Sequence, residues 1–231
     1  MDASLVELRG VGKSFGGPVG GAPVEVFAGV DLTLARGETL AVVGPSGSGK
    51  STLLNLVGGL DQASSGEVLF EGELLADKNA DQLAALRNEK IGFVFQSHHL
   101  LPQCSALENV LVPTLARSGR GAGEVEQRAR ALLDRVGLGS RMDHRPGLLS
   151  GGECQRVAFV RAWIHQPALI VADEPTGALD VDTADELSDL LIEWNREQGT
   201  ALLVVTHSQR LAQRMERVLT LERGRLQPLG A

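Results

Sequence analysis

The chain has 231 residues, of which 43% are hydrophobic and 22% charged, a balance typical of one large globular domain. Its net charge of −7 and its 3% of aromatic residues argue against a nucleic-acid binder, which needs a basic surface or rings for base stacking. No apolar run reaches the roughly 18 residues of a membrane span, and the acidic, mixed N-terminus does not resemble a signal peptide.

The first 60 residues are predicted to form strands and one helix. Short strands are expected at residues 4–8, 25–27 and 30–34. The glycine-rich loop 16–23 is expected to be the tip of a hairpin between the first two strands. The continuous apolar run Thr39–Val43 predicts a buried parallel strand, and residues 51–60 predict a helix directly after it.

The sequence GPSGSGKST lies between this strand and this helix and fits the phosphate-binding pattern G-x-x-x-x-G-K-[ST]. In that setting, glycines let backbone N–H groups surround phosphate oxygens, and the helix start adds the positive end of its dipole. We expect Lys50 to reach the outer phosphates and the Ser51 hydroxyl to bind Mg²⁺. The residues predicted to form this loop are Gly44, Pro45, Ser46, Gly47, Ser48, Gly49, Lys50, Ser51 and Thr52.

The middle of the chain changes from mixed strands and helices to mostly helices. Strands are expected at residues 67–70 and 91–95, and a helix near residues 81–87. Gln96 follows the second strand, where its amide could bind a metal or water, or could relay a movement. We predict a helical subdomain over about 97–148, including a helix at 123–136, inserted into an α/β core of residues 1–96 and 149–231.

The segment LLSGGECQRVAF, residues 148–159, predicts a helix start with conflicting features. Ser150 and Glu153 have the spacing of a capping box, in which each side chain bonds the other's backbone N–H. Gly151 and Gly152 follow in the first turn, although glycine costs up to about 1 kcal/mol inside a helix. A plain cap explains Ser150 and Glu153 but not the glycines, whereas an anion at the helix start would explain a bare backbone there.

The two cysteines, Cys104 and Cys154, have no metal-like spacing and favour a reducing compartment. Cys154 lies beside the predicted helix start. We expect it to be inert, and the alternative is a redox-sensitive thiol whose pKa is lowered by the helix N-terminus.

Two later apolar strands end in residues that can perform chemistry. In LIVADEP, strand alternation is expected to send Asp173 and Glu174 to different sides, so that Asp173 binds Mg²⁺ and Glu174 polarises a water. In VVTHS, the strand ends at His207. The carboxyl ends of parallel strands share one edge of a sheet, so Lys50, Asp173, Glu174 and His207 are expected to converge. Helices are also predicted at 151–165, 183–196 and 209–214, and a hairpin at 217–227.

The sequence resembles the ATP-binding cassette (ABC) ATPases in a set of residues and motifs that occur in the same chain order. They are Phe15, GPSGSGKST, Gln96, LSGGE, LIVADE, Ala178-Leu179-Asp180 and His207. The resemblance implies a P-loop α/β fold, Mg²⁺ and ATP as ligands, and a head-to-tail dimer with two nucleotides between the copies. It implies that Glu174 is the catalytic carboxylate, His207 the γ-phosphate switch and Phe15 the ring that stacks on adenine. The residues it places against the other copy's ATP are Ser150, Gly151, Gly152, Glu153 and Asp180.

Within that family, the sequence is similar to the ATPases of lipoprotein-releasing transporters. The similarity lies in the segments FQSHHLLPQCSALENV, LLNLVGGLD and ADEPTGALD. That likeness implies transmembrane permease subunits as partners and a place at the cytoplasmic face of the inner membrane. The ATPases of macrolide exporters and of cell division share much of this pattern, including modules that regulate a cell-envelope partner. A P-loop phosphotransferase is a more distant alternative, in which LSGGE would have no role.

Overall fold

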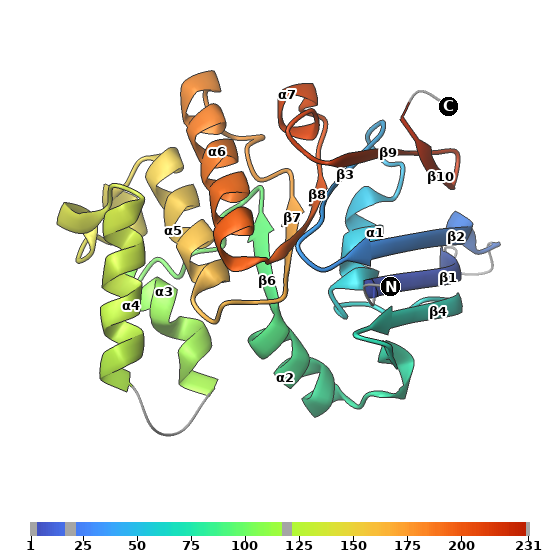
Figure 1. Cartoon of the computed structure of the whole chain (residues 1–231), viewed down its shortest axis with the longest axis horizontal. Coiled ribbons are helices and arrows are strands. Elements are labelled where there is room, and N and C mark those ends of the chain that lie inside the picture. Colours follow the sequence, from blue (N-terminus) through green and yellow to red (C-terminus); the bar gives the residue numbers. More distant parts are fainter. Residues whose placement is uncertain (1–3, 17–21, 117–121, 230–231) are drawn as a thin grey trace.

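The computed structural model describes residues 4–16, 22–116 and 122–229, which form two sheets flanked by helices (Figure 1). The larger sheet has the strand order β10-β9-β3-β8-β7-β6. Its strands are β3 (Thr39–Val43), β6 (Ile91–Phe95), β7 (Leu169–Asp173), β8 (Ala201–Val205), β9 (Arg217–Glu222) and β10 (Arg225–Pro228). Neighbours from β6 to β9 are parallel and β10 is antiparallel to β9, so five carboxyl ends meet at one edge.

The smaller sheet is antiparallel, in the order β2-β1-β4-β5. Its strands are β1 (Ser4–Phe15), β2 (Val24–Ala35), β4 (Ser65–Phe70) and β5 (Glu73–Leu74). The prediction of three short strands before residue 35 was wrong, because β1 and β2 run on through irregularities in their register. Gly10 and Gly29 adopt the left-handed φ angles of 57° and 65° there, and Asp31 accepts a hydrogen bond from the Gly10 N–H at 2.7 Å.

The hairpin between β1 and β2 is present, since Phe15 pairs with Val24 across it. Most of its predicted tip, residues 17–21, lies outside the described residues.

One core fills the space between the two sheets. The helix α1 (Lys50–Val57) lies in it and buries Leu53, Leu54 and Leu56 against strands of both sheets. The helix α2 (Ala80–Lys90) and the turn η1 (Leu75–Asp77) lie beside this layer and lead into β6. Because α1 begins where the phosphate-binding loop ends, this core also fixes the orientation of the loop.

A second core covers the opposite face of the large sheet. Its helices are α3 (Ala106–Leu111), α4 (Ala122–Arg135), α5 (Gly151–Trp163), α6 (Val181–Gln198) and α7 (Gln209–Ala212), with the 3-10 turns η2 (Val112–Ala116), η3 (Gly139–Arg141) and η4 (Pro146–Leu148). The rings of Phe159, Trp163 and Trp194 pack together with centroids 4.4 to 5.7 Å apart. Within the described residues, no helix has the length and apolar character that crossing a bilayer requires.

The helices and 3-10 turns of the predicted insert begin at Ala106, after an irregular stretch, and α3 and α4 lie at one end of the molecule (Figure 1). Their apolar side chains nevertheless belong to the same core as α5 and the sheet. The segment therefore shares a hydrophobic core with the rest of the chain, and its division from residues 1–96 and 149–231 stays a prediction.

Candidate functional site

A cavity of about 550 Å³ lies at the carboxyl edge of the large sheet, beside the ends of β3, β7 and β8. It is lined by Val26, Gly44, Ser46, Gly47, Gly49, Lys50, Ser51, Thr52, Gln96, Asp173, Glu174 and His207. The parallel strands thus bring together the four side chains that were expected to converge. Pro45 and Ser48 lie in the same loop outside this lining, and Val26 on β2 was not anticipated.

The loop from Gly44 to Thr52 depends on glycine where it begins, at Gly44, and where α1 starts, at Gly49. A Cβ on Gly44 would lie 2.4 Å from the carbonyl oxygen of Leu221, and a Cβ on Gly49 would lie 2.5 Å from Val26 Cγ1. Gly49 is also the N-cap of α1, at a φ of 99°. No side chain caps this helix start and no acidic residue lies in its first turn, so its N–H groups remain available to an anion.

Lys50 folds back over the loop. Its ammonium donates to the carbonyl oxygens of Gly44 at 2.9 Å and Pro45 at 3.0 Å. The nearby hydroxyl oxygen of Ser48 is buried without a hydrogen-bond partner. A lysine ammonium beside an uncapped helix start is a suitable donor arrangement for phosphate oxygens.

Asp173 ends β7 and accepts a hydrogen bond from the Ser51 hydroxyl. Burial raises the pKa of Asp173, and the neighbouring Glu174 carboxylate adds to that effect, while Ser51 and Lys50 oppose it. A half-buried carboxylate beside a hydroxyl is an oxygen donor pair that suits a hard cation. The described residues contain no cluster of three or more His, Cys, Asp or Glu side chains suited to a metal, so hydroxyl, amide, water or phosphate oxygens would have to complete such a shell.

Glu174 follows β7 in a left-handed conformation with a φ of 46°, which is uncommon for a non-glycine residue. Its N–H donates to Val205 at 2.9 Å. One carboxylate oxygen, Oε2, accepts from the Thr206 hydroxyl at 3.0 Å and the His207 N–H at 3.1 Å. The other, Oε1, lies 2.8 Å from His207 Nδ1. The end of β8 therefore holds both the backbone and the side chain of Glu174.

Gln96 and Phe15 are placed differently by the structure. Gln96 is exposed and lines the cavity. Its amide nitrogen lies beside Gly177, so that a Cβ added to Gly177 would be 3.3 Å from it. Phe15 does not line the cavity, and its side chain is 46% exposed. The ammonium of Lys13 lies 4.9 Å from its ring centroid. The adenine-stacking role of Phe15 stays a prediction.

The start of α5 has the predicted capping box. Glu153 accepts from the Ser150 N–H at 2.7 Å, and the Ser150 hydroxyl accepts from the Glu153 N–H at 3.2 Å. Asp180 caps the neighbouring helix α6 and accepts from Thr183. None of the residues expected to contact ATP from another copy lines the cavity in this chain.

Two expectations about α5 need correction. A Cβ on Gly152 would lie 2.7 Å from Thr183 Cγ2, so packing against α6 already explains this glycine, whereas a Cβ on Gly151 would meet no atom within 4 Å.

The alternative of a reactive Cys154 was wrong. The residue is 3% exposed, burial raises the pKa of its thiol, and its Sγ donates to Pro146 at 3.6 Å.

Gln155 is a buried polar residue that the sequence patterns did not single out. Its amide nitrogen donates to the carbonyl oxygens of Phe95 and Pro175, both at 2.9 Å. These two residues adjoin Gln96 and Glu174. The only sequence signal was a glutamine on the buried side of a predicted helix, which alone does not identify its partners.

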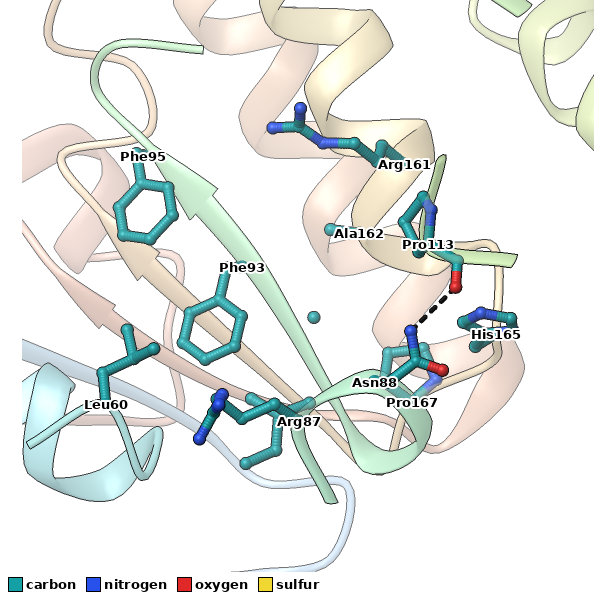
Figure 2. Close-up of a pocket in the computed structure, with 12 residues that line it drawn as sticks. Leu60, Arg87, Asn88, Phe93, Phe95, Pro113, Arg161, Ala162, His165 and Pro167 are labelled. Carbon is teal, nitrogen blue, oxygen red and sulfur yellow. Dashed lines mark hydrogen bonds between the residues drawn. The ribbon is translucent and has the colours of Figure 1, made fainter. Parts of the chain in front are cut away.

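A second cavity of about 390 Å³ opens beside β6, between α2 and α5 (Figure 2). The stacked rings of Phe93 and Phe95 lie along β6 with centroids 5.9 Å apart, and Arg87 and Arg161 approach from different elements. The full lining is Leu60, Arg87, Asn88, Ile91, Gly92, Phe93, Phe95, Pro113, Arg161, Ala162, His165 and Pro167. It is a mostly apolar hollow with basic groups at its border.

Arg161 connects this second cavity to the segment after Gln96. Its guanidinium donates to the carbonyl oxygens of His98 at 2.7 Å and His99 at 2.8 Å.

Comparison with known proteins matches residues 27–177 to the family model described as ABC transporter. The chain is 52% identical over 226 residues to the lipoprotein-releasing system ATP-binding protein LolD of Pseudomonas syringae pv. tomato, covering 97% of this chain and 98% of the relative. It is 50% identical over 207 residues to LolD of Legionella pneumophila strain Lens, covering 90% and 91%.

Solved structures agree with these relatives. The dimeric, post-hydrolysis structure of the ATP-binding cassette MJ0796 bound to ADP and Pi superposes with a TM-score of 0.88 at 38% identity, covering 96% of each chain. Another dimeric structure of MJ0796 gives the same score at 39% identity. Together with the family model and the curated relatives, this likeness shows that the chain belongs to the ABC transporter family, as one of its ATPase cassettes.

Proposed function

We propose that the protein is the ATP-hydrolysing subunit of a lipoprotein-releasing transporter, bound at the cytoplasmic face of the inner membrane. The observation that carries the hydrolytic part is the single cavity that gathers Lys50, Asp173, Glu174 and His207. The lipoprotein-releasing part is supported by LolD relatives at about half identity over nearly the whole chain.

The chain's own groups divide the work of hydrolysis. The phosphate loop and Lys50 bind the phosphates of ATP, with the nine residues from Gly44 to Thr52 around them. Ser51, Asp173 and Gln96 would hold Mg²⁺, which when bound would neutralise charge on the phosphates. Glu174 orients the attacking water and accepts its proton, and His207 hydrogen-bonds to the γ-phosphate.

A second copy of the chain completes the site. The partly exposed surface formed by Ser150, Gly151, Gly152, Glu153 and Asp180 carries a capped helix start. In a head-to-tail dimer this surface faces the γ-phosphate of ATP bound to the other copy. The dimeric state of MJ0796 with ADP and Pi supports this arrangement.

The hollow beside β6 is the docking site for the transmembrane permease subunits. Its stacked phenylalanines offer apolar area, and Arg161 joins its wall to the segment after Gln96. Through that connection, closure of the ATP sites is transmitted to the membrane partner.

The test is Glu174→Gln, with Glu67→Gln on the exposed part of β4 as the matched control. Glu174→Gln should lower the turnover of ATP about 100- to 10,000-fold while ATP binding persists and the dimer accumulates, because only the proton acceptor is lost. Glu67→Gln should leave all three unchanged. Unchanged turnover in Glu174→Gln would remove the catalytic role assigned to this carboxylate.

The same trapped variant serves as bait for membrane partners. Purified from detergent-solubilised membranes, it should retain permease subunits with a large periplasmic domain, and vesicles rebuilt with the complex should release lipoprotein when ATP is added. Recovery of the permease without lipoprotein release would favour an exporter or a regulatory partner. Appearance of a phosphorylated small molecule would instead favour a phosphotransferase.

A further inference from the structure

The hydroxyl group of Thr206 lies directly behind the Glu174 carboxylate. Thr206 is fully buried and follows the last residue of β8. Its oxygen lies 3.0 Å from Glu174 Oε2 and accepts the N–H of Ser208 at 2.9 Å. A backbone N–H can only donate, so the single hydroxyl hydrogen is free to donate to the carboxylate.

The other donors described for this carboxylate belong to His207. Its backbone N–H also reaches Oε2, at 3.1 Å, and its ring contacts Oε1. The His207 side chain is 68% exposed, so its ring has room to leave Oε1 for a phosphate. Thr206 has no such freedom. Once the ring turns away, Oε2 is still held by two donors while Oε1 is released.

The end of β8 is itself fixed to the strand that precedes the phosphate loop. The Thr206 N–H donates to Val42 on β3 at 3.2 Å. The chain continues from β3 directly into Gly44 and the rest of the loop. Thr206 therefore joins the Glu174 carboxylate to the same framework that positions the phosphates.

We propose that Thr206 is a positioning residue that fixes Oε2 of Glu174 so that Oε1 faces the attacking water. This rests on the proposed ATPase mechanism. In the step concerned, the water oxygen bonds to the γ-phosphorus and its proton passes to Glu174 Oε1. The bond from phosphorus to the bridging oxygen breaks, and ADP leaves with that electron pair. Thr206 keeps its own proton and touches neither water nor ATP.

The test compares Thr206→Val, which removes the hydroxyl, with Thr206→Ser, which keeps it. Thr206→Val should lower kcat about 10- to 100-fold with little change in KM for ATP, because a misaligned base weakens the chemical step and not ground-state binding. Thr206→Ser should restore kcat to within about threefold of the unmodified protein, since the donor is still present.

Thr200→Val is the matched control for the loss of a buried threonine hydroxyl. Thr200 is also buried, next to the start of β8, and its hydroxyl donates to Pro167 at 2.8 Å, and neither residue lines the cavity that holds Glu174. Thr200→Val should lower the melting temperature. It should not show the fall in kcat at nearly constant KM that is expected of Thr206→Val. A general structural effect would make the two valine variants behave alike.

Two results would overturn the proposal, namely a kcat for Thr206→Val within twofold of the unmodified protein, or a Thr206→Ser variant as slow as Thr206→Val. The turnover of Glu174→Gln distinguishes failure of the proposed ATPase mechanism from failure of the role proposed for Thr206. If Glu174→Gln keeps its turnover, the proposed mechanism fails. If Glu174→Gln is inactive while Thr206→Val is fully active, only the role of Thr206 fails.

Discussion

Gly152 at the start of α5 offers a test of whether its bare backbone serves packing or a neighbouring nucleotide. In Gly152→Ala, the added Cβ would lie 2.7 Å from Thr183 Cγ2, which is too close for two carbon atoms. Thr183 cannot move freely, because Asp180 accepts its N–H at 3.0 Å and its hydroxyl at 2.8 Å. In Gly151→Ala, the Cβ would meet nothing within 4 Å.

The two substitutions should therefore change stability in opposite directions. Alanine in place of glycine stabilises a helix by up to about 1 kcal/mol, which is all that Gly151→Ala experiences. Gly152→Ala also overpacks the contact with Thr183 at a cost of about 1–3 kcal/mol, for a net loss of up to about 2 kcal/mol. For a chain of this size, each kcal/mol corresponds to roughly 2–4 °C of melting temperature.

Hydrolysis should fall in both variants despite their opposite stabilities. If the backbone N–H groups face ATP on a second copy, a methyl group at either position keeps the phosphate away from them. We expect a loss of at least about tenfold in turnover, equivalent to about 1.4 kcal/mol, with ATP binding by the single chain unchanged. Thermal melting, nucleotide binding, ATP turnover and dimer formation in the Glu174→Gln background measure these effects separately.

A double variant separates packing from the nucleotide contact. Thr183→Ser removes the methyl group that Gly152→Ala would strike but keeps the hydroxyl that bonds Asp180. Gly152→Ala with Thr183→Ser should regain stability and remain inactive. The reasoning would be refuted if this pair regained full turnover, or if Gly151→Ala hydrolysed ATP at the unmodified rate, because glycine would then serve only the chain's own packing.

Two further predictions follow from the ionisable groups. Burial raises the pKa of Asp173 above 3.8, so the folded state binds this proton more tightly than the unfolded state, and the associated stability is lost as pH rises through the raised pKa. Asp173→Asn should therefore raise the melting temperature of the nucleotide-free protein at neutral pH, and the difference should shrink on acidification. Mg²⁺-dependent hydrolysis should be lost. A lower melting temperature at neutral pH would contradict this. Because Cys154 is buried and its thiol pKa is raised, thiol reagents should label Cys104 first. Cys154→Ala should keep turnover within about twofold of the unmodified protein. Rapid labelling of Cys154 in the folded protein would contradict this.

The strands of the large sheet could be predicted from local sequence because their apolar runs are continuous. β3 and β6 have the predicted bounds, since burial on both faces leaves a run of apolar residues with a distinct end. The prediction ended the first strand at Leu8, before Gly10, and divided the second strand around Gly29. Only the pairing between the two strands shows that these glycines sit at irregularities that the strands continue through.

The position of the chemical groups was predictable, but the contacts that orient them were not. Motif spacing placed Lys50, Asp173, Glu174 and His207 at one sheet edge, where the cavity has them. Strand alternation was the expected cause of the different directions of the two carboxylates. In the structure β7 ends at Asp173, and the left-handed backbone of Glu174 turns its side chain toward Thr206 and His207. That contact depends on two strands far apart in the sequence.

Gln155 shows how the two halves of the proposed mechanism are joined within one chain. It lies one turn beyond the start of α5, whose exposed end would face the nucleotide of another copy. Its amide holds the carbonyl oxygens of Phe95 and Pro175, one residue away from Gln96 and Glu174. A rigid shift of α5 would either carry both segments with it or break both hydrogen bonds of the buried Gln155 amide. Since an unpaired buried polar group costs about 1–3 kcal/mol, moving the segments together is the less costly response.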